Sequence, residues 1–158
     1  MTDEVHDRIR DYWDRDSHTY DETRSHSISD PLEAAAWRQA LADALPEPGT
    51  KVLDVGAGTG ALSLLAAELG HEVTALDLSP GMLGRAELKA KERGLEERMR
   101  FVVGSGTEPP RASTLSQAAS VSSTAKYTIQ WLGRSVGHMS PTMGIIPPML
   151  RSPTFHSV

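Results

Sequence analysis

The segment that most constrains the fold of this chain is KVLDVGAGTG, at residues 51–60. A short apolar run ends in Asp54, and glycine then recurs at every second position. Residues 61–69 have the pattern of a helix, so the segment predicts a strand, a glycine-rich turn and a helix N-terminus. Because glycine has no Cβ atom, a ligand can lie directly against the backbone of such a turn. The segment therefore predicts an α/β fold that binds a nucleoside cofactor.

Two carboxylates stand where a bound nucleoside would need them. Asp77 ends a second apolar run, VTALD, and a carboxylate there can accept hydrogen bonds from both ribose hydroxyls. Asp54 ends its own run two residues before the first glycine. Each has a purely structural alternative, because Asp77 could cap the helix that begins near Pro80 and Asp54 could cap the turn.

The pattern from residue 51 to residue 104 alternates strands with helices. We expect strands at 51–55, 72–77 and 99–103, and helices at 61–69 and 80–93. This order implies parallel strands that are joined by right-handed crossovers. Residues 51–104 are therefore predicted to form a partial Rossmann-like core that binds the cofactor.

Residues 1–50 predict a helical segment before this core. The apolar side chains of a first helix, at about 4–15, share one face, and we expect Tyr12 and Trp13 to pack there. Asp30 and Pro31 are typical of a helix start, and that second helix should run to about residue 45. Four of its apolar side chains are available for burial: Leu32, Ala36, Leu41 and Leu45.

Composition changes abruptly after Gly104. Residues 1–104 hold 20 acidic and 12 basic residues, whereas residues 105–158 hold one acidic and four basic residues with 16 Ser and Thr and six Pro. Two explanations are a linker-like tail and coding sequence read out of its original frame, and we favour the second. We expect residues 105–158 to be a poorly ordered tail and the α/β fold to be incomplete, with strands one to three and their helices.

One segment of this tail has the pattern of a strand. Residues 126–132, KYTIQWL, alternate apolar and polar side chains. With three strands alone, strand one would be a bare edge, and this segment could cover it. One face of the sheet would still lack its covering helix.

These motifs resemble those of class I S-adenosylmethionine-dependent methyltransferases, in particular the type-11 or ubiquinone-biosynthesis-like group. VLDVGAGTG is similar to the glycine motif of that family, and ALDLSPGML is similar to its second motif. The Tyr20-Asp21 pair resembles the N-terminal lid segment of the family. The likeness covers residues 8–104.

The resemblance implies a cofactor, S-adenosyl-L-methionine, and a small-molecule methyl acceptor. It implies that the floor beneath the methionine and the ribose is formed by Gly56, Ala57, Gly58 and Gly60. Asp54 would help to hold the ammonium group of the cofactor, and Asp77 would bind the ribose hydroxyls. Leu78 and Met82 would line the adenine slot, although Met82 could equally be a core residue.

The resemblance also implies that Tyr20 closes over the cofactor. After strand three the family usually has Gly-Asp-Ala, whereas this chain has Gly104-Ser105-Gly106. Ser105 could still donate a hydrogen bond near the adenine, but it lacks the charge. The acidic start of strand four and the Pro-Gly-Gly turn of the family are absent, so no catalytic base is assigned.

Two other functions stay open from the sequence. The chain could be a fragment of an NAD(P)-dependent oxidoreductase, because Gly56, Gly58 and Ala61 also satisfy the dinucleotide pattern. Asp54 and the long helical segment before strand one argue against this alternative. The chain could also be a non-catalytic remnant that binds the cofactor or a full-length relative.

Composition narrows the class of protein. A formal net charge of −5 argues against a general nucleic-acid binder. The absence of cysteine excludes disulfides and thiolate metal ligands, and the histidines show no metal-ligand spacing, so we expect no metal. The sequence has no run of 18 apolar residues, so we expect no membrane partner and a cytoplasmic location.

The reading-frame hypothesis makes a prediction that needs only the gene. If the tail is out of frame, one of the two other frames after codon 104 will encode an acidic strand, a helix and a Pro-Gly-Gly turn. Sequencing the locus and translating all three frames checks this. If neither alternative frame encodes these elements, a diverged terminus becomes the better explanation.

Overall fold

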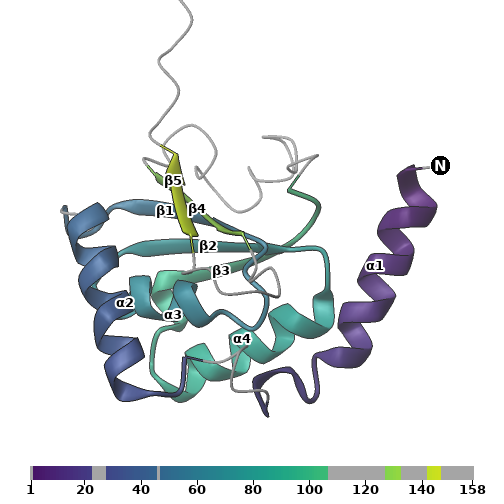
Figure 1. The fold of residues 1–158 in the computed structure, drawn as a ribbon, viewed down its shortest axis with the longest axis horizontal. Coiled ribbons are helices and arrows are strands. Elements are labelled where there is room, and N and C mark those ends of the chain that lie inside the picture. The colour runs from purple at the N-terminus through teal and green to yellow at the C-terminus, as the bar shows by residue number, and fades with distance from the viewer. Residues whose placement is uncertain (1, 23–27, 46, 107–126, 133–141, 147–158) are drawn as a thin grey trace, which may run out of the picture.

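The computed structural model describes residues 2–22, 28–45, 47–106, 127–132 and 142–146. Within these ranges the chain forms a five-stranded sheet with three helices against it (Figure 1). The strand order is β3-β2-β1-β4-β5. Three parts of the predicted tail lie outside the described residues: 107–126, which includes Glu108, 133–141 and 147–158.

The three parallel strands expected from the sequence are confirmed. They are β1 (Lys51–Val55), β2 (Glu72–Asp77) and β3 (Met99–Val103). β1 pairs with β2 with Val52 opposite Val73, and β2 pairs with β3 with Val73 opposite Met99. The apolar runs therefore lie in register across the sheet, as strands covered by helices require.

Two further strands extend the sheet beyond β1. β4 (Tyr127–Leu132) pairs with β1 in parallel, with Val52 opposite Tyr127. β5 (Thr142–Ile146) pairs with β4 in the antiparallel sense. The segment that was expected to cover strand one is therefore a neighbour of β1, and β1 is a central strand with both edges paired.

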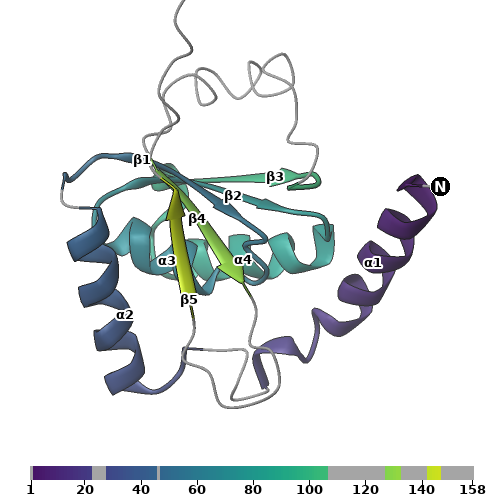
Figure 2. The same ribbon diagram turned by 45° about the horizontal axis from the view of Figure 1, so that its top comes forward.

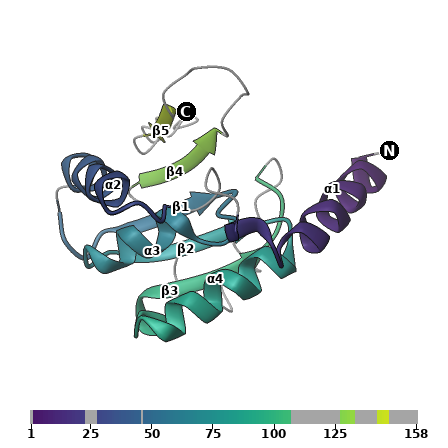
Figure 3. The same ribbon diagram turned by 60° about the horizontal axis from the view of Figure 1, so that its bottom comes forward.

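Three helices lie on one face of the sheet: α2 (Pro31–Ala44), α3 (Ala61–Glu68) and α4 (Pro80–Glu92) (Figure 3). Topology dictates this for α3 and α4. The crossovers from β1 to β2 and from β2 to β3 step in the same direction, so right-handed connections place both helices on the same side. Among the described helices, none covers the opposite face, as expected for an incomplete fold.

The core lies between these helices and the sheet. α2 contributes Trp37 and Leu41, and Leu45 follows as its C-cap residue; all three pack with Val52 of β1 and with the leucines of α3. The expected burial of Leu32 and Ala36 is wrong, since Leu32 is 82% exposed and Ala36 is also exposed. The buried stripe of α2 follows a four-residue spacing from Trp37, and Leu32 lies roughly 140° around the helix from it.

The predicted helix starts are confirmed by their caps. Asp30 accepts hydrogen bonds from the backbone N–H groups of Leu32 at 2.8 Å and Glu33 at 3.2 Å. Ser79 caps α4 by accepting a hydrogen bond from the N–H of Met82 at 3.0 Å. Each cap satisfies N–H groups that a helix leaves unpaired at its first turn.

The N-terminal helix α1 (Thr2–Asp16) lies apart from the sheet and contacts α4 near its own C-terminal end (Figures 1 and 2). A short 3-10 helix, η1 (Tyr20–Glu22), follows it. The expected packing of Tyr12 holds only in part, because its ring meets that of Trp13 edge-on with centroids 4.9 Å apart while the residue is 55% exposed. Trp13 is half-buried, and its ring lies 5.9 Å from that of Tyr20. No helix in the described ranges is long and apolar enough to cross a bilayer.

Replacing Gly60 tests the packing between the glycine turn and α4. Gly60 has φ 81°, and an added Cβ would lie 2.9 Å from the Cβ of Ala86. Gly60→Ala should therefore lower the free energy of unfolding by about 2–4 kcal/mol, from left-handed strain and overpacking combined. Urea unfolding measures the change.

Gly84→Ala is the matched control. Gly84 lies within α4, and an added Cβ would meet no atom within 4 Å. The substitution should leave stability unchanged or raise it by up to about 1 kcal/mol, because alanine is the better helix former. Equal stability of the two variants would contradict the close packing of Gly60.

Candidate functional site

The candidate site lies at the carboxyl ends of β1 and β2. The chain leaves β1 toward β2 on one side, while β4 lies on the other side. In open α/β sheets this reversal of strand order creates a crevice in which ligands bind. The glycine turn follows β1 at this edge.

The glycine turn exposes its backbone. Gly56, Gly58 and Gly60 have φ values of 74°, 55° and 81°, a region that residues with side chains rarely adopt. A Cβ atom added at Gly56 or Gly58 would meet no atom within 4 Å, so nothing in the described structure fills the space beside this backbone. The N–H groups of Gly56 and Ala57 hold the turn by donating to the Leu76 carbonyl at 2.8 and 3.1 Å.

Asp77 connects the two turns of the site. One carboxylate oxygen accepts a hydrogen bond from the Gly58 N–H at 2.8 Å, and the other accepts one from the Ser79 N–H at 2.9 Å. The side-chain cap of α4 comes from Ser79 and not from Asp77. Each carboxylate oxygen has a second lone pair, so Asp77 retains capacity for further donors.

Asp54 lies deeper, at the end of β1. Its side chain is 1% exposed, and one of its oxygens accepts a hydrogen bond from the Ser63 hydroxyl at 2.6 Å. The other oxygen, Oδ1, is buried and has no hydrogen-bond partner among the described residues. Burial raises the pKa of Asp54 to about 6, against the lowering effect of Ser63, and the charge of Asp77 raises it further. An unpaired buried carboxylate oxygen favours a cationic or N–H ligand.

The structure brings the N-terminal segment to the same place. Burial raises the pKa of the Tyr20 phenol, and three nearby carboxylates raise it further: Asp16, Asp21 and Asp77. Asp21 accepts a hydrogen bond from the Thr59 hydroxyl at 2.6 Å, within the glycine turn. The segment that carries Tyr20 therefore lies beside the glycine turn, and the closing of Tyr20 over the cofactor stays a prediction.

Three further predicted residues surround these turns. Leu78 follows Asp77 and is half-buried, whereas Met82, in the first turn of α4, is only 2% exposed. Ser105 is also half-buried and follows Gly104, whose N–H donates to the Asp77 carbonyl at 2.9 Å. The adenine contacts of all three stay predictions.

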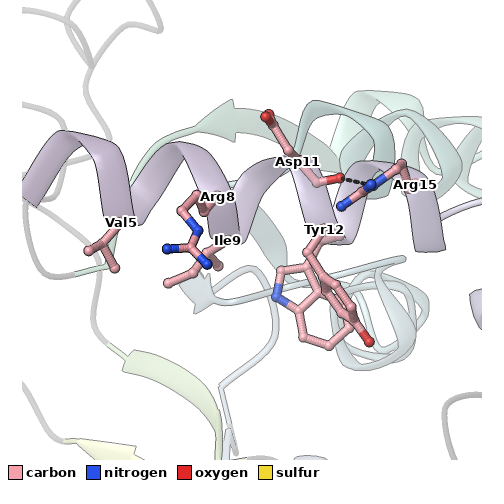
Figure 4. A pocket seen from close by; sticks show the side chains of 7 residues that line it. Val5, Arg8, Ile9, Asp11, Tyr12 and Arg15 are labelled. Carbon is pink, nitrogen blue, oxygen red and sulfur yellow. Dashed lines mark hydrogen bonds between the residues drawn. The ribbon is translucent and has the colours of Figure 1, made fainter.

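A hollow of about 500 Å³ lies along the exposed face of α1 (Figure 4). Its apolar lining comes from Val5, Ile9, Tyr12 and Trp13, and its polar lining comes from Arg8, Asp11 and Arg15. Among the described residues, no group of three His, Asp or Glu side chains is placed to hold a metal ion.

Sequence reasoning missed several polar residues that build the site. Ser63 is a polar residue in the apolar run ALSLLAA, which is a signal that could have been used. Thr59, Asp14 and Lys89 gave no signal, because their contacts join segments that are far apart in the chain.

The buried carboxyl of Asp54 should make stability depend on pH. Its pKa of about 6 in the folded protein is above the ordinary value of 3.8, so the folded state holds the proton more tightly. The stability that this proton contributes is present below pH 4 and is lost as the pH rises through about 6, by up to about 3 kcal/mol.

Asp54→Asn removes this titration, so its stability relative to the wild type should rise over the same interval. Urea unfolding of both proteins at each pH unit from 4 to 8 measures the difference. Ser63→Ala removes the hydrogen bond that lowers the pKa, so it should shift the transition to higher pH. If the difference in unfolding free energy between Asp54→Asn and the wild type does not change with pH, the raised pKa of Asp54 is contradicted.

Comparison with known proteins places the chain in a family. Residues 52–133, just over half of the chain, match the methyltransferase domain family. The chain is 40% identical over 84 residues to demethylmenaquinone methyltransferase of Tropheryma whipplei, an alignment that covers 52% of this chain and 34% of the relative. It is 38% identical over 80 residues to the ubiquinone/menaquinone biosynthesis C-methyltransferase UbiE of Cereibacter sphaeroides, covering 49% and 32%. The chain thus spans about a third of the length of these relatives.

Solved structures agree on the fold. The cyclase SpnF superposes with a TM-score of 0.56 at 22% identity, over 66% of this chain and 44% of SpnF. The family match begins within β1 and runs through the glycine turn, Asp77 and β4, so it covers most of the residues that build the candidate site. The chain belongs to the family of class I S-adenosylmethionine-dependent methyltransferases.

Proposed function

We propose that this chain binds S-adenosyl-L-methionine at the carboxyl ends of β1 and β2 and transfers its methyl group to a small-molecule acceptor. The observation that carries the proposal is the unpaired Oδ1 of Asp54, buried beneath a turn whose backbone is bare at Gly56 and Gly58. A ligand with an ammonium group beside a flat nucleoside would satisfy the oxygen and fill the open space.

The residues present fit this cofactor in charge as well as in shape. S-adenosyl-L-methionine carries positive charge on its ammonium and sulfonium groups, and the site presents the carboxylates of Asp54 and Asp77. The pyrophosphate of NAD(P) is negative and would lie at the glycine turn, where the ionised carboxylate of Asp54 at the end of β1 would repel it. The charges of the site therefore favour the methyl donor over a nicotinamide cofactor.

Each predicted residue has a role in this proposal. Asp54 holds the ammonium group, Asp77 accepts from the ribose hydroxyls, and Tyr20 covers the cofactor. The floor is Gly56, Ala57, Gly58 and Gly60, and the adenine side is Leu78, Met82 and Ser105. The cofactor supplies an activated methyl group, so the task of the protein is alignment and the exclusion of water.

The class of acceptor rests on separate support. The two relatives described above have quinones in their names, demethylmenaquinone in one and ubiquinone and menaquinone in the other, and quinones are small molecules. The apolar hollow along α1 offers a surface for such an acceptor. We assign no catalytic base among the described residues. The cytoplasmic location and the out-of-frame tail stay predictions from the sequence.

Calorimetric titration tests the cofactor. The chain should bind S-adenosylhomocysteine, the product form, and give no binding heat with NAD. Asp77→Asn replaces the charged acceptor of the ribose hydroxyls by an amide, so it should weaken binding by roughly tenfold or more. Asp43→Asn is the matched control, because Asp43 lies exposed on α2, where its carboxylate accepts a hydrogen bond from the Gln39 side chain at 2.8 Å.

Binding of NAD without S-adenosylhomocysteine would refute the proposed cofactor. Transfer of a radiolabelled methyl group into small-molecule extracts then tests activity. Binding without transfer would identify the chain as a non-catalytic remnant that holds the cofactor.

A further inference from the structure

Residues 2–22, here called the N-terminal strap, are attached to the cofactor turns at two points. The first point is Asp14, near the end of α1. Its Oδ1 accepts a hydrogen bond from the backbone N–H of Gly81 at 2.8 Å and another from the Ser79 hydroxyl. An added Cβ at Gly81 would lie 2.9 Å from that oxygen and from the Ser17 hydroxyl, so the strap can pack this closely on α4 only because residue 81 is glycine. Asp14 therefore fixes the strap to the start of α4 by a close fit to the backbone.

The second point is Asp21, in η1. One of its oxygens accepts from the Thr59 hydroxyl at 2.6 Å, and the other pairs with the Lys89 ammonium at 3.0 Å. Thr59 lies in the glycine turn between Gly58 and Gly60 and is 2% exposed. The side chains of Asp21 and Lys89 are 26% and 24% exposed, so the pair is partly shielded from water. Asp21 thus joins the strap to the turn through side chains alone.

Tyr20 lies between the two points. Its ring and that of Trp13 meet edge-on with centroids 5.9 Å apart, and burial and the charges of nearby carboxylates, Asp77 among them, raise the pKa of its phenol. Because Asp21 follows Tyr20 directly in the chain, the contact of Asp21 with Thr59 and Lys89 sets where the Tyr20 ring lies. A strap freed at Asp21 but held at Asp14 would carry Tyr20 away from the ribose side of the site.

We propose that Asp21 is a positioning residue that latches the strap onto the glycine turn, so that closure of the strap and binding of the cofactor strengthen each other. This inference rests on the proposed function, since it concerns the same cofactor site. The coupling is reciprocal by thermodynamic linkage: if the closed strap tightens binding of the cofactor, the bound cofactor must favour the closed strap by the same factor.

The test uses the full chain, with trypsin and S-adenosylhomocysteine as probes. The strap contains three arginines, and cleavage after Arg15, which lies between the two attachment points, reports local opening there. Asp21→Asn should weaken the binding of S-adenosylhomocysteine by roughly 5- to 10-fold, which is in the usual range of coupling between sites. It should also speed tryptic cleavage of the ligand-free protein. Asp21→Glu keeps the charge, so it should restore most of the affinity and most of the resistance to cleavage. Asp43→Asn, on the exposed side of α2 and outside the strap, should behave as the wild type.

A merely structural role of Asp21 predicts a different result. Asp21→Asn would then lower stability, yet S-adenosylhomocysteine would bind as tightly and protect the strap as strongly as in the wild type, and this outcome overturns the proposal. If Asp21→Asn does not fold, the latch can be opened from the other side. Thr59→Val should then reproduce the loss, Thr59→Ser should not, and equal behaviour of these two variants also overturns the proposal.

The same experiment separates this inference from the proposed function. If the wild type binds no S-adenosylhomocysteine, the proposed cofactor is wrong, but cleavage of the ligand-free protein still reports on the latch. If Asp21→Asn is cleaved faster than the wild type, Asp21 does latch the strap, but the coupling to the cofactor is overturned. Equal cleavage of the two proteins would overturn both the latch and the coupling.

Discussion

The carboxylate of Asp77 holds the candidate site together. Its two oxygens accept backbone N–H groups from two different turns, one after β1 and one after β2, so a single side chain sets the distance between them. The Leu76 carbonyl adds two more contacts to the glycine turn. These contacts hold the turn through its backbone N–H groups and leave open space beside Gly56 and Gly58. A turn held in this way can present bare backbone and still be rigid.

Several carboxylates lie around this turn, and their proximity lowers the stability of the folded chain. Asp54 is buried with one unpaired oxygen, which disfavours its ionised form. Asp21 and Asp77 lie close to the Tyr20 phenol, and Lys89 balances only the first of them directly. Sites commonly retain such local conflict when a ligand resolves it. A cofactor that carries two positive charges is the kind of ligand that would do so here.

The features that the sequence could predict are those decided by neighbours in the chain. The bounds of β1 and the cap at Asp30 follow from short patterns, and the structure confirms both. The exposure of Leu32 and Tyr12 could not be predicted, because it depends on where α1 and α2 meet the sheet. The contacts of Asp14 and Asp21 were invisible for the same reason, since each joins residues more than 35 positions apart. Carboxylates in a polar segment are usually solvated, and only the fold shows that these two are partly buried against the cofactor turns.

The pairing of β1 explains why the site depends on residues far from its motifs. A glycine turn after an edge strand would move with that strand, since one row of its backbone groups would be free. In this chain β4 pairs with β1 from Val52 to Val55, right up to the start of the turn. β4 itself is paired on its far side by β5, whose antiparallel direction needs no crossover helix. The atypical C-terminal part of the chain therefore supplies the strand that makes β1 central, and the geometry of the turn follows from that position.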